Sequence, residues 1–551
     1  MEAVQPLTPF LFIATRLDAE VFGILSGHRL RLLVDLHPDA HAANPLAEEA
    51  GLYGLDYLPL PLRGERLDER DADALAMALE CSGPAVLYGA EPGRLAALWA
   101  LAEAPRYGAE ALLEMLALAG FESGHLRARL QARRAAALRS GAFASGTVEY
   151  DVIVAGAGAA GCAVTASLLK RAPFLKIAVL DPSEHHYYQP GWTLVGAGIF
   201  DPARTLRPMR QCIPERATWI RQAVRAFDPL SNRVLLADGS RLRYRALAVC
   251  TGLELAWDAV EGLRESLGQH GVTSNYVYSL APYTWQQVRE LRRGTALFTQ
   301  PPIPIKCAGA PQKAMYLSCD WWRRQGILGD IQVDFRSAGN ALFSVEAFVP
   351  PLMRYVKRYG AHLHFGQTLV AVDGPARRAT FRVLDPQGGS RLEEQRFDLL
   401  HAVPPQRPPE CVRASFLANP EGWLEVDPYT LQHPRFANVF GLGDIIGASN
   451  AKTAAAVRKQ APVVAENLLR TLADEAPRSR YDGYGACPLT VERGRVVLAE
   501  FGYGGRLLPS FPGDPRVPRR SAWALKTRVM PRVYFDLMLK GREWLAASRE
   551  P

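Results

Sequence analysis

The chain has 551 residues, of which 48% are hydrophobic and 22% are charged. This composition is that of a globular protein and excludes disorder, collagen and coiled coil as descriptions of the whole chain; the length predicts three or four domains of about 150 residues each. The net charge of +8 suits an anionic cofactor or an anionic membrane surface and does not by itself indicate nucleic acid, and eight cysteines are too few for a disulfide scaffold.

The N-terminus has none of the features of a secretory signal. Residues 1–6 read MEAVQP, without a basic start followed by an apolar core. No uncharged apolar run reaches the roughly 20 residues needed to span a bilayer. We therefore expect a cytoplasmic protein with reduced thiols, either soluble or bound peripherally to the inner face of the cell membrane.

Residues 1–128 alternate strand-like and helix-like runs, which predicts a small α/β domain with a parallel sheet. Short apolar runs at 10–16, 31–37 and 85–91 are the expected strands, and the last of them leads into a helical run at 93–104. Ala and Arg, then Gly and Ser, dominate 126–148. This change predicts the end of a surface helix and a linker over 129–148.

A dinucleotide fingerprint follows. Residues 151–158 read as a buried strand, 159–172 as a helix and 176–181 as the next strand. The turn matches GxGxxG, and an aspartate closes the second strand; the residues are Gly156, Gly158, Ala159, Ala160, Gly161 and Asp181. The first glycine permits the tight turn, the second lets the backbone approach a pyrophosphate, and the third allows close packing of helix and strand. The helix N-terminus attracts the phosphates, and the carboxylate accepts hydrogen bonds from ribose hydroxyls.

Two later segments indicate FAD. The run 439–447 leads into Gly443 and Asp444, whose carboxylate suits the ribityl chain of a flavin. Residues 451–469 are strongly helix-forming, and the N-terminus of that helix, with Lys452 and Thr453, would direct its positive dipole at the flavin. The strand and glycine turn at 247–255, with Thr251 and Gly252, close the first nucleotide domain. We expect an FAD-binding domain over 149–256 and 400–480.

The block 257–399 should form a second nucleotide-type domain, but its glycines are missing. After the strand-like run 295–300 the chain reads PPIPIKCAGAP. Proline has no backbone N–H, so this loop cannot form a phosphate cradle. NAD(P)H is therefore disfavoured as electron partner, and quinone is the natural alternative if the protein touches a membrane.

The C-terminal region, 481–551, ends in a basic, aromatic-rich segment. One helical face carries apolar and aromatic side chains, and basic residues occupy other positions; the face consists of Met530, Val533, Tyr534, Leu537 and Met538, with Trp544 and Leu545 beyond it. This pattern is typical of an interfacial membrane helix and equally of a helix that packs on its own protein. Both interpretations stay open.

From about Tyr150 onward the chain resembles the sulfide:quinone oxidoreductase family. The resemblance rests on five long segments: 185–198 (HHYYQPGWTLVGAG), 272–276 (VTSNY), 298–317 (FTQPPIPIKCAGAPQKAMYL), 441–457 with GLGD and NAKTAAAV, and 481–489 (YDGYGACPL). It implies FAD in a glutathione-reductase-like fold, quinone as electron acceptor and peripheral membrane attachment.

The same resemblance implies two redox cysteines beside the flavin, one in 271–276 and one after Asp444. Here Thr273 and Ile445 stand at those places, so sulfide oxidation by the usual route is in doubt. Cys307 is the first candidate for a substitute because it lies in a loop, ahead of Cys162, Cys250 and Cys487. A donor that passes hydride directly to flavin would need no cysteine.

Residues 1–128 resemble small phosphatase-like domains of the DUF442 type, which are related to dual-specificity phosphatases. The resemblance rests on 57–64, 71–79 and 86–101 and implies a loop with a cysteine nucleophile and an arginine. Here the nucleophile position is Gly89, Glu91 brings negative charge into the loop, and Arg94 remains. We expect a degenerate anion loop in a domain used for binding or assembly.

Together these features predict an α/β flavoprotein with a phosphatase-like domain, two dinucleotide-type domains and C-terminal helices. We expect an FAD-dependent oxidoreductase that passes electrons from a small reduced donor, sulfide or another, through FAD to quinone. Cys307 and Lys452 are the catalytic candidates, and neither a metal nor nucleic acid is expected. The alternative is a flavin-bound sensor or scaffold without turnover. The sequence does not decide between a monomer and a homo-oligomer.

Overall fold

The structure is a computed structural model. It describes residues 4–8, 11–27, 30–62, 64, 66–81, 85–105, 109–140, 149–385, 388–543 and 545–546. The chain divides into two compact units. The first comprises 1–149, 224–244 and 414–416, and the second comprises the remaining residues.

The first unit contains a five-stranded sheet in the order β1-β2-β5-β3-β4. Its pairs are parallel except β1 with β2, as expected for an α/β domain. The strands are β1 (Val4–Thr8), β2 (Leu11–Ala14), β3 (Leu32–Asp35), β4 (Asp56–Pro59) and β5 (Ala85–Tyr88). The helices are α1 (Ala19–Gly27), α2 (Pro45–Leu52), α3 (Glu69–Cys81), α4 (Pro92–Glu103), α5 (Ala109–Leu118) and α6 (Arg127–Ser140). Helix α6 covers the first part of the expected linker, and 141–148 lie outside the described residues.

The predicted βαβ unit is present. Strand β6 (Glu149–Ala155) runs parallel to β7 (Ile177–Leu180), and α7 (Ala159–Arg171) connects them. The side chains of Val152, Ile153 and Val154 are fully buried, which explains the continuous apolar run of this strand. The sheet order is β10-β7-β6-β13-β12-β11, with β24 paired to β13. The other strands are β10 (Thr218–Ile220), β11 (Val224–Asp228), β12 (Arg233–Leu236), β13 (Arg241–Val249) and β24 (Val439–Gly441).

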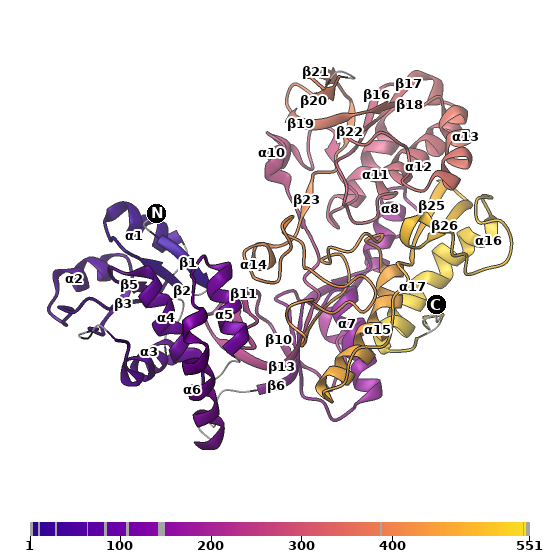
Figure 1. The fold of residues 1–551 in the computed structure, drawn as a ribbon. Helices are drawn as coiled ribbons and strands as arrows, with labels where there is room; N and C mark the ends of the chain where they lie inside the picture. Colours follow the sequence, from indigo (N-terminus) through magenta and orange to yellow (C-terminus); the bar gives the residue numbers. More distant parts are fainter. Residues whose placement is uncertain are drawn as a thin grey trace. The chain divides into compact units, whose positions relative to one another are not determined.

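Helix α15 (Ala454–Leu472) packs against α7 (Figure 1). Two short strands, β8 (His185–Tyr187) and β9 (Leu206–Pro208), pair antiparallel beyond β7. Helix α15, although far along the sequence, therefore packs on the helix of the βαβ unit.

A second, all-parallel sheet has the order β15-β22-β16-β17-β18. Its strands are β15 (Val272–Thr273), β16 (Gly294–Gln300), β17 (Ile331–Ser337), β18 (His362–Phe365) and β22 (Leu399–His401), and its helices are α11 (Ala281–Glu290), α12 (Ala310–Arg324) and α13 (Val349–Tyr359). An antiparallel sheet is formed by β19 (Gln367–Asp373), β20 (Arg378–Leu384) and β21 (Ser390–Arg396). The proline-rich loop lies between β16 and α12, where a dinucleotide domain would carry its glycine turn.

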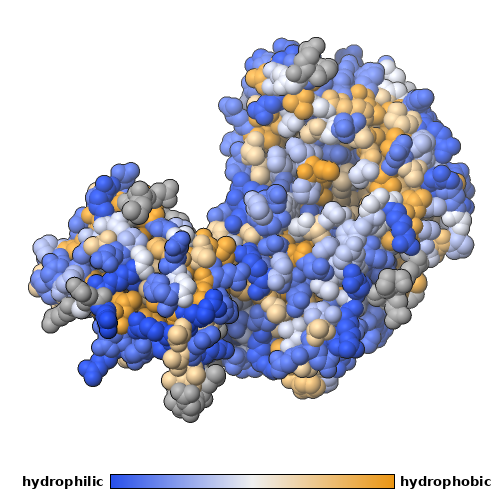
Figure 2. All heavy atoms as spheres, viewed as in Figure 1, coloured by the Kyte–Doolittle hydropathy of each residue, from blue (hydrophilic) through white to orange (hydrophobic). Residues whose placement is uncertain are grey.

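The C-terminal part begins with the antiparallel pair β25 (Gly485–Glu492) and β26 (Arg495–Phe501), and β25 packs on α12. A helical segment follows, composed of α16 (Arg520–Ala524), α17 (Met530–Arg532) and the π-helical turns 525–529 and 533–537. In the face shown in Figure 2, apolar side chains gather in the hollowed part of the larger unit. Within the described ranges, no helix combines the length and the apolar character that crossing a membrane demands.

Candidate flavin site

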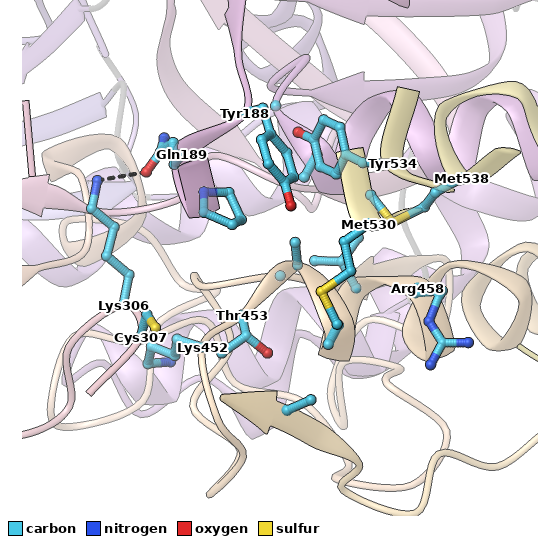
Figure 3. A pocket seen from close by; sticks show the side chains of 18 of the residues that line it. Tyr188, Gln189, Lys306, Cys307, Lys452, Thr453, Arg458, Met530, Tyr534 and Met538 are labelled. Atoms are coloured by element: carbon cyan, nitrogen blue, oxygen red, sulfur yellow. Dashed lines mark hydrogen bonds between the residues drawn. The ribbon is translucent and has the colours of Figure 1, made fainter. Parts of the chain in front are cut away.

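The second unit contains a cavity of about 450 Å³. It is lined by the turn before α7, by the ends of β7 and β24 and by the start of α15, and Figure 3 shows part of its wall. Most of the residues predicted to bind the cofactor meet here: Gly158, Ala159, Ala160, Asp181, Gly252, Gly443, Asp444, Lys452 and Thr453. Gly156, Gly161 and Thr251 are not part of the lining.

The three fingerprint glycines have distinct surroundings. A Cβ on Gly161 would lie 1.8 Å from the carbonyl oxygen of Gly156, and one on Gly156 would lie 2.5 Å from the carbonyl oxygen of Cys250. A Cβ on Gly158 would meet nothing within 4 Å. Two glycines therefore allow backbone segments to pack, whereas Gly158 leaves open space in front of the turn.

Gly158 is the N-cap of helix α7 and has no side chain to cap it. The first N–H groups of a helix have no partner within the helix and attract anions. The open space in front of Gly158 thus faces donors suited to a pyrophosphate.

Asp181 is held by two backbone N–H groups. Its Oδ2 accepts from Ala157 N and its Oδ1 accepts from Ser183 N, both at 2.8 Å. These bonds fix the carboxylate at the cavity wall, where it can still accept from a ribose hydroxyl, since each oxygen has two lone pairs.

Asp444, Lys306 and Lys452 form one charged cluster in the cavity wall. Lys452 Nζ donates to the carbonyl oxygens of Asp444 and Ile446, both at 2.8 Å, and Lys306 Nζ donates to Gln189 Oε1 at 2.9 Å (Figure 3). Burial raises the pKa of Asp444 against the opposing effect of both lysines. Burial lowers the pKa of Lys452 to about 8 and also lowers that of Lys306, with Asp444 opposing in each case.

The start of α15 adds a second helix N-terminus. Thr453 caps it, since its side chain accepts from Ala456 N, and Thr453, Ala454 and Ala455 line the cavity. The positive end of this helix therefore lies at the cavity, as predicted for the site of a flavin that gains negative charge on reduction.

The residues fit FAD. Within the described part of the chain, the side-chain amide of Asn275 is buried at the cavity wall without a hydrogen-bond partner. Buried polar groups normally have partners, so the cavity suits a ligand with polar atoms. The open cradle at Gly158, two helix N-termini and the lysine pair match a molecule with a pyrophosphate and a ring that becomes negatively charged.

The C-terminal segment forms another wall of the cavity. Tyr534, Met538 and Met530 line it together with Tyr188 (Figure 3). Tyr534 OH lies 2.8 Å from His186 Nε2, and burial lowers the pKa of His186 to about 4, so this imidazole is neutral at physiological pH. Of the 530–538 face, Tyr534 and Met538 are buried, whereas Met530, Val533 and Leu537 are partly exposed, so both interpretations of this face stay predictions. Trp544 lies outside the described residues.

The positions where redox cysteines were expected lie in the core. Thr273 is fully buried and its hydroxyl pairs with that of Thr284 at 2.8 Å, and Ile445 is fully buried as well. Neither lines the cavity, whereas Cys307 does. Asn275 and Asp444, close to these positions in sequence, do line the cavity, and its thiols are those of Cys250, after β13, and Cys307, in the proline-rich loop.

Sequence reasoning missed several lining residues. They are Tyr188, Gln189, Lys306, Lys313, Arg458 and Tyr484. Tyr188 and Gln189 fall within the HHYYQPGW segment, and Lys306 and Lys313 flank Cys307, so the long family-like segments were the signal that could have identified these four.

In the first unit, the expected anion loop connects β5 to α4. A Cβ on Gly89 would lie 3.1 Å from the Leu95 side chain, Glu91 occupies the N-cap of α4 without a side-chain cap bond, and Arg94 donates to the carbonyl oxygen of Gly64. The loop thus places Arg94 at the start of α4, and the Arg94 guanidinium is hydrogen-bonded to the backbone carbonyl oxygen of Gly64.

Comparisons with known proteins identify similar chains. The mitochondrial sulfide:quinone oxidoreductase of Dictyostelium discoideum is 40% identical over 394 residues, which is 71% of this chain and 86% of the relative. The mouse mitochondrial sulfide:quinone oxidoreductase is 34% identical over 404 residues, 73% of this chain and 89% of the relative. No family model matches the chain.

The crystal structure of the sulfide:quinone oxidoreductase from Aquifex aeolicus has a similar fold. It aligns with a TM-score of 0.60 at 18% identity and covers 72% of this chain and 92% of its own. At that identity the likeness concerns the fold alone, and it confirms the predicted α/β architecture.

Proposed function

This chain is an FAD-dependent oxidoreductase of the sulfide:quinone oxidoreductase family, and from that premise we propose that it passes electrons from a small reduced donor to a quinone. One observation carries the proposal. A single cavity joins the dinucleotide turn, the start of α15, a thiol and an apolar, aromatic wall. FAD, when bound, supplies two-electron redox chemistry. The protein residues bind and orient it, exclude water and set the local charge.

The acceptor side of the proposal rests on two features. The loop after β16 carries prolines where a cradle for NAD(P)H would need backbone N–H groups. The wall formed by Met530, Tyr534 and Met538 offers apolar and aromatic surface next to the site, which suits a quinone ring. NADH therefore serves as the negative control in the experiment below.

The donor is proposed to be a small sulfur compound or another small reductant. Thr273 and Ile445 cannot carry sulfane sulfur, which argues against the usual sulfide route. Cys307 lines the cavity and is the candidate thiol for an altered route.

Anaerobic stopped-flow spectroscopy of the purified holoprotein tests this function. We expect sulfide or a small thiol to bleach the oxidised flavin and a soluble quinone to restore it, while NADH leaves the spectrum unchanged. If no reductant in a broad panel bleaches the flavin, the protein is the flavin-bound sensor or scaffold. Rapid bleaching by NADH would contradict the argument from the proline-rich loop.

We propose that the protein contacts the cytoplasmic membrane face through the C-terminal region. Support comes from exposed apolar side chains with basic neighbours: Phe511, Val529 and Leu545 are 40–43% exposed, and Arg528 and Arg532 are exposed as well. Deleting 521–551 would also remove a wall of the cavity, so point variants are sharper. Val529→Glu and Arg532→Glu, at exposed residues outside the cavity lining, should abolish co-flotation with anionic vesicles and keep the flavin. Unchanged flotation would refute the contact.

For residues 1–128 we propose a phosphatase-like module that binds an anion without hydrolysing it. Arg94 at the start of α4 supports binding, and glycine in place of a nucleophile argues against turnover. Calorimetry with phosphate and thiosulfate should give heat that Arg94→Ala removes and Arg70→Ala, on exposed α3 surface, does not. Hydrolysis of para-nitrophenyl phosphate by the wild type would overturn the degenerate interpretation.

A further inference from the structure

Two thiols meet beside the flavin cavity. Cys307, in the loop before α12, and Cys487, on β25, have their Sγ atoms 3.7 Å apart although 180 residues separate them in the chain. Gly309 allows this approach, because a Cβ there would lie 2.5 Å from the Cys487 sulfur. We propose that Cys307 and Cys487 form a reversible dithiol–disulfide pair through which a sulfur-containing donor delivers electrons to the flavin site. The proposal deepens the proposed function and rests on it.

The backbone of the loop holds Cys307 toward its partner. Its φ of +49° is rare for a residue with a side chain. Cys307 N donates to Lys452 O at 2.8 Å, and Cys307 O accepts from Ala310 N at 2.7 Å. These bonds tie the thiol both to the lysine at the flavin site and to the start of α12.

Two buried lysines make the pair reactive. Lys313 Nζ lies 3.0 Å from the Cys307 sulfur and 3.9 Å from the Cys487 sulfur, and Lys526 Nζ donates to the carbonyl oxygen of Pro488, next to Cys487, at 2.9 Å. Both lysines are only 4% exposed. A buried ammonium requires a counter-charge, and a thiolate supplies it.

The proton distribution follows from this arrangement. A hydrogen bond from Cys487 and the charge of Lys313 lower the pKa of Cys307 despite its burial, and the same hydrogen bond together with burial raises the pKa of Cys487. Burial acts to lower the pKa of Lys313, but the two thiols outweigh it and the net direction is upward. Burial and Lys313 lower the pKa of Lys526 to about 7. The resting pair is thus a Cys307 thiolate that accepts from the Cys487 thiol.

Other cysteines differ from this pair. Burial raises the pKa of Cys162, Cys250 and Cys319, and raises that of Cys212 to about 11. Burial in apolar surroundings makes a thiol inert. Among the described cysteine side chains, the short sulfur–sulfur contact and the adjacent lysines therefore single out Cys307 and Cys487.

Oxidation of the pair releases one proton and two electrons. A sulfur–sulfur bond forms between the Cys307 thiolate and the Cys487 thiol, one proton leaves Cys487, and two electrons are released to the two-electron acceptor, which is the family's FAD. In the opposite half, a hydrosulfide or small thiolate attacks the sulfur of Cys307, the disulfide breaks, and Cys487 leaves as a thiolate next to Lys313 and Lys526. The donor sulfur is then bound to Cys307, the more exposed of the two. A second hydrosulfide or thiolate takes up that sulfur and releases the Cys307 thiolate, which returns the pair to its reduced form.

Mass spectrometry of the FAD-loaded full-length protein tests the pair directly. After oxidation and alkylation, proteolysis should yield a peptide that links 307 to 487 and is lost on reduction. Cys487→Ser and Cys307→Ser should each abolish it, whereas Cys411→Ser, at a partly exposed thiol far along the chain, should retain it. Absence of the linked peptide from oxidised wild type overturns the proposal.

Two kinetic readouts complete the test. Cys487→Ser should keep its flavin and slow donor-driven flavin reduction at least about tenfold, and Lys313→Met should shift the pH midpoint of Cys307 alkylation upward by about one unit or more. If the donor reduces the flavin of Cys487→Ser as fast as that of the wild type, the pair is overturned and the proposed function still stands. A linked peptide in a protein that no donor reduces would support the pair and refute the proposed function.

Discussion

Alanine at Gly158 and at Gly161, introduced one at a time, separates two roles of the glycine turn. At Gly161 the new Cβ would lie 1.8 Å from the carbonyl oxygen of Gly156 and 3.2 Å from Val154 Cγ1. The oxygen belongs to the backbone, so β6 and α7 must move apart. Overpacking of this kind costs about 3 kcal/mol, the upper part of the usual range, because no flexible side chain can give way.

At Gly158 the same methyl group meets nothing within 4 Å, and the backbone at φ −67° and ψ −165° is open to alanine. The stability of the protein itself should therefore change by no more than about 0.5 kcal/mol. The methyl group would instead occupy the space in front of the α7 N-terminus. We expect the dissociation constant of FAD to rise at least about tenfold, which corresponds to about 1.4 kcal/mol.

Two measurements distinguish these outcomes. Thermal unfolding followed by circular dichroism on flavin-free protein reports the fold, and fluorescence titration with FAD reports the site. Gly161→Ala should melt at least about 5 °C below wild type, whereas Gly158→Ala should melt with wild type and bind FAD weakly. Wild-type affinity in Gly158→Ala would refute the pyrophosphate cradle, and wild-type melting in Gly161→Ala would refute the packing argument.

Three further predictions concern single buried groups. Burial lowers the pKa of His401 to about 4, and its Nε2 accepts from Asn275 N at 3.0 Å, so the fold needs the neutral ring. This contribution to the unfolding free energy is fully present above about pH 6.5 and should fall by about 1–3 kcal/mol as the pH drops toward 4. Denaturant titrations of His401→Gln should show an unfolding free energy that depends less steeply on pH. The same pH dependence of the unfolding free energy in His401→Gln and wild type would refute the role given to His401. Lys452→Met removes a cation from the cavity and should lower the midpoint potential of the flavin by about 30 mV or more, which corresponds to about 1.4 kcal/mol for two electrons. Spectroelectrochemistry measures this potential. An unchanged value would show that Lys452 does not act on the flavin ring. Tyr534→Phe removes the 2.8 Å hydrogen bond to His186 and should lower the unfolding free energy by about 1 kcal/mol. Tyr283→Phe is the milder comparison, because the Tyr283 hydroxyl accepts a longer hydrogen bond, at 3.3 Å, from Gly271 N.

The nucleotide-binding turn could be predicted from the sequence because its determinants are local. A buried strand, three glycines and a helix follow one another within about 20 residues, and each glycine answers a steric demand of the turn itself. The start of α15 with Lys452 and Thr453 was identified for the same reason, since helix capping depends on neighbours in sequence.

The thiol site could not be predicted in the same way. Family resemblance indicates that Thr273 and Ile445 stand where redox cysteines are expected, and both side chains are fully buried. Cys307 was chosen for its loop position, but nothing in its own segment points to Cys487. The contact exists only because β25 packs on α12, which brings together parts of the chain that are 180 residues apart.

The orientation of the C-terminal face was likewise undecided by its pattern. An apolar helical face must leave water, but the spacing of its residues does not say whether lipid or protein covers it. The tertiary structure adds that Tyr534 OH lies 2.8 Å from His186 Nε2, across 348 residues, which accounts for the buried position of Tyr534. For this protein, local steric and capping rules in the sequence determined the cofactor-binding turn and the fold class. Long-range packing alone decided which thiols, lysines and aromatic rings share the cavity, because proximity in a folded chain depends on burying distant surfaces against each other.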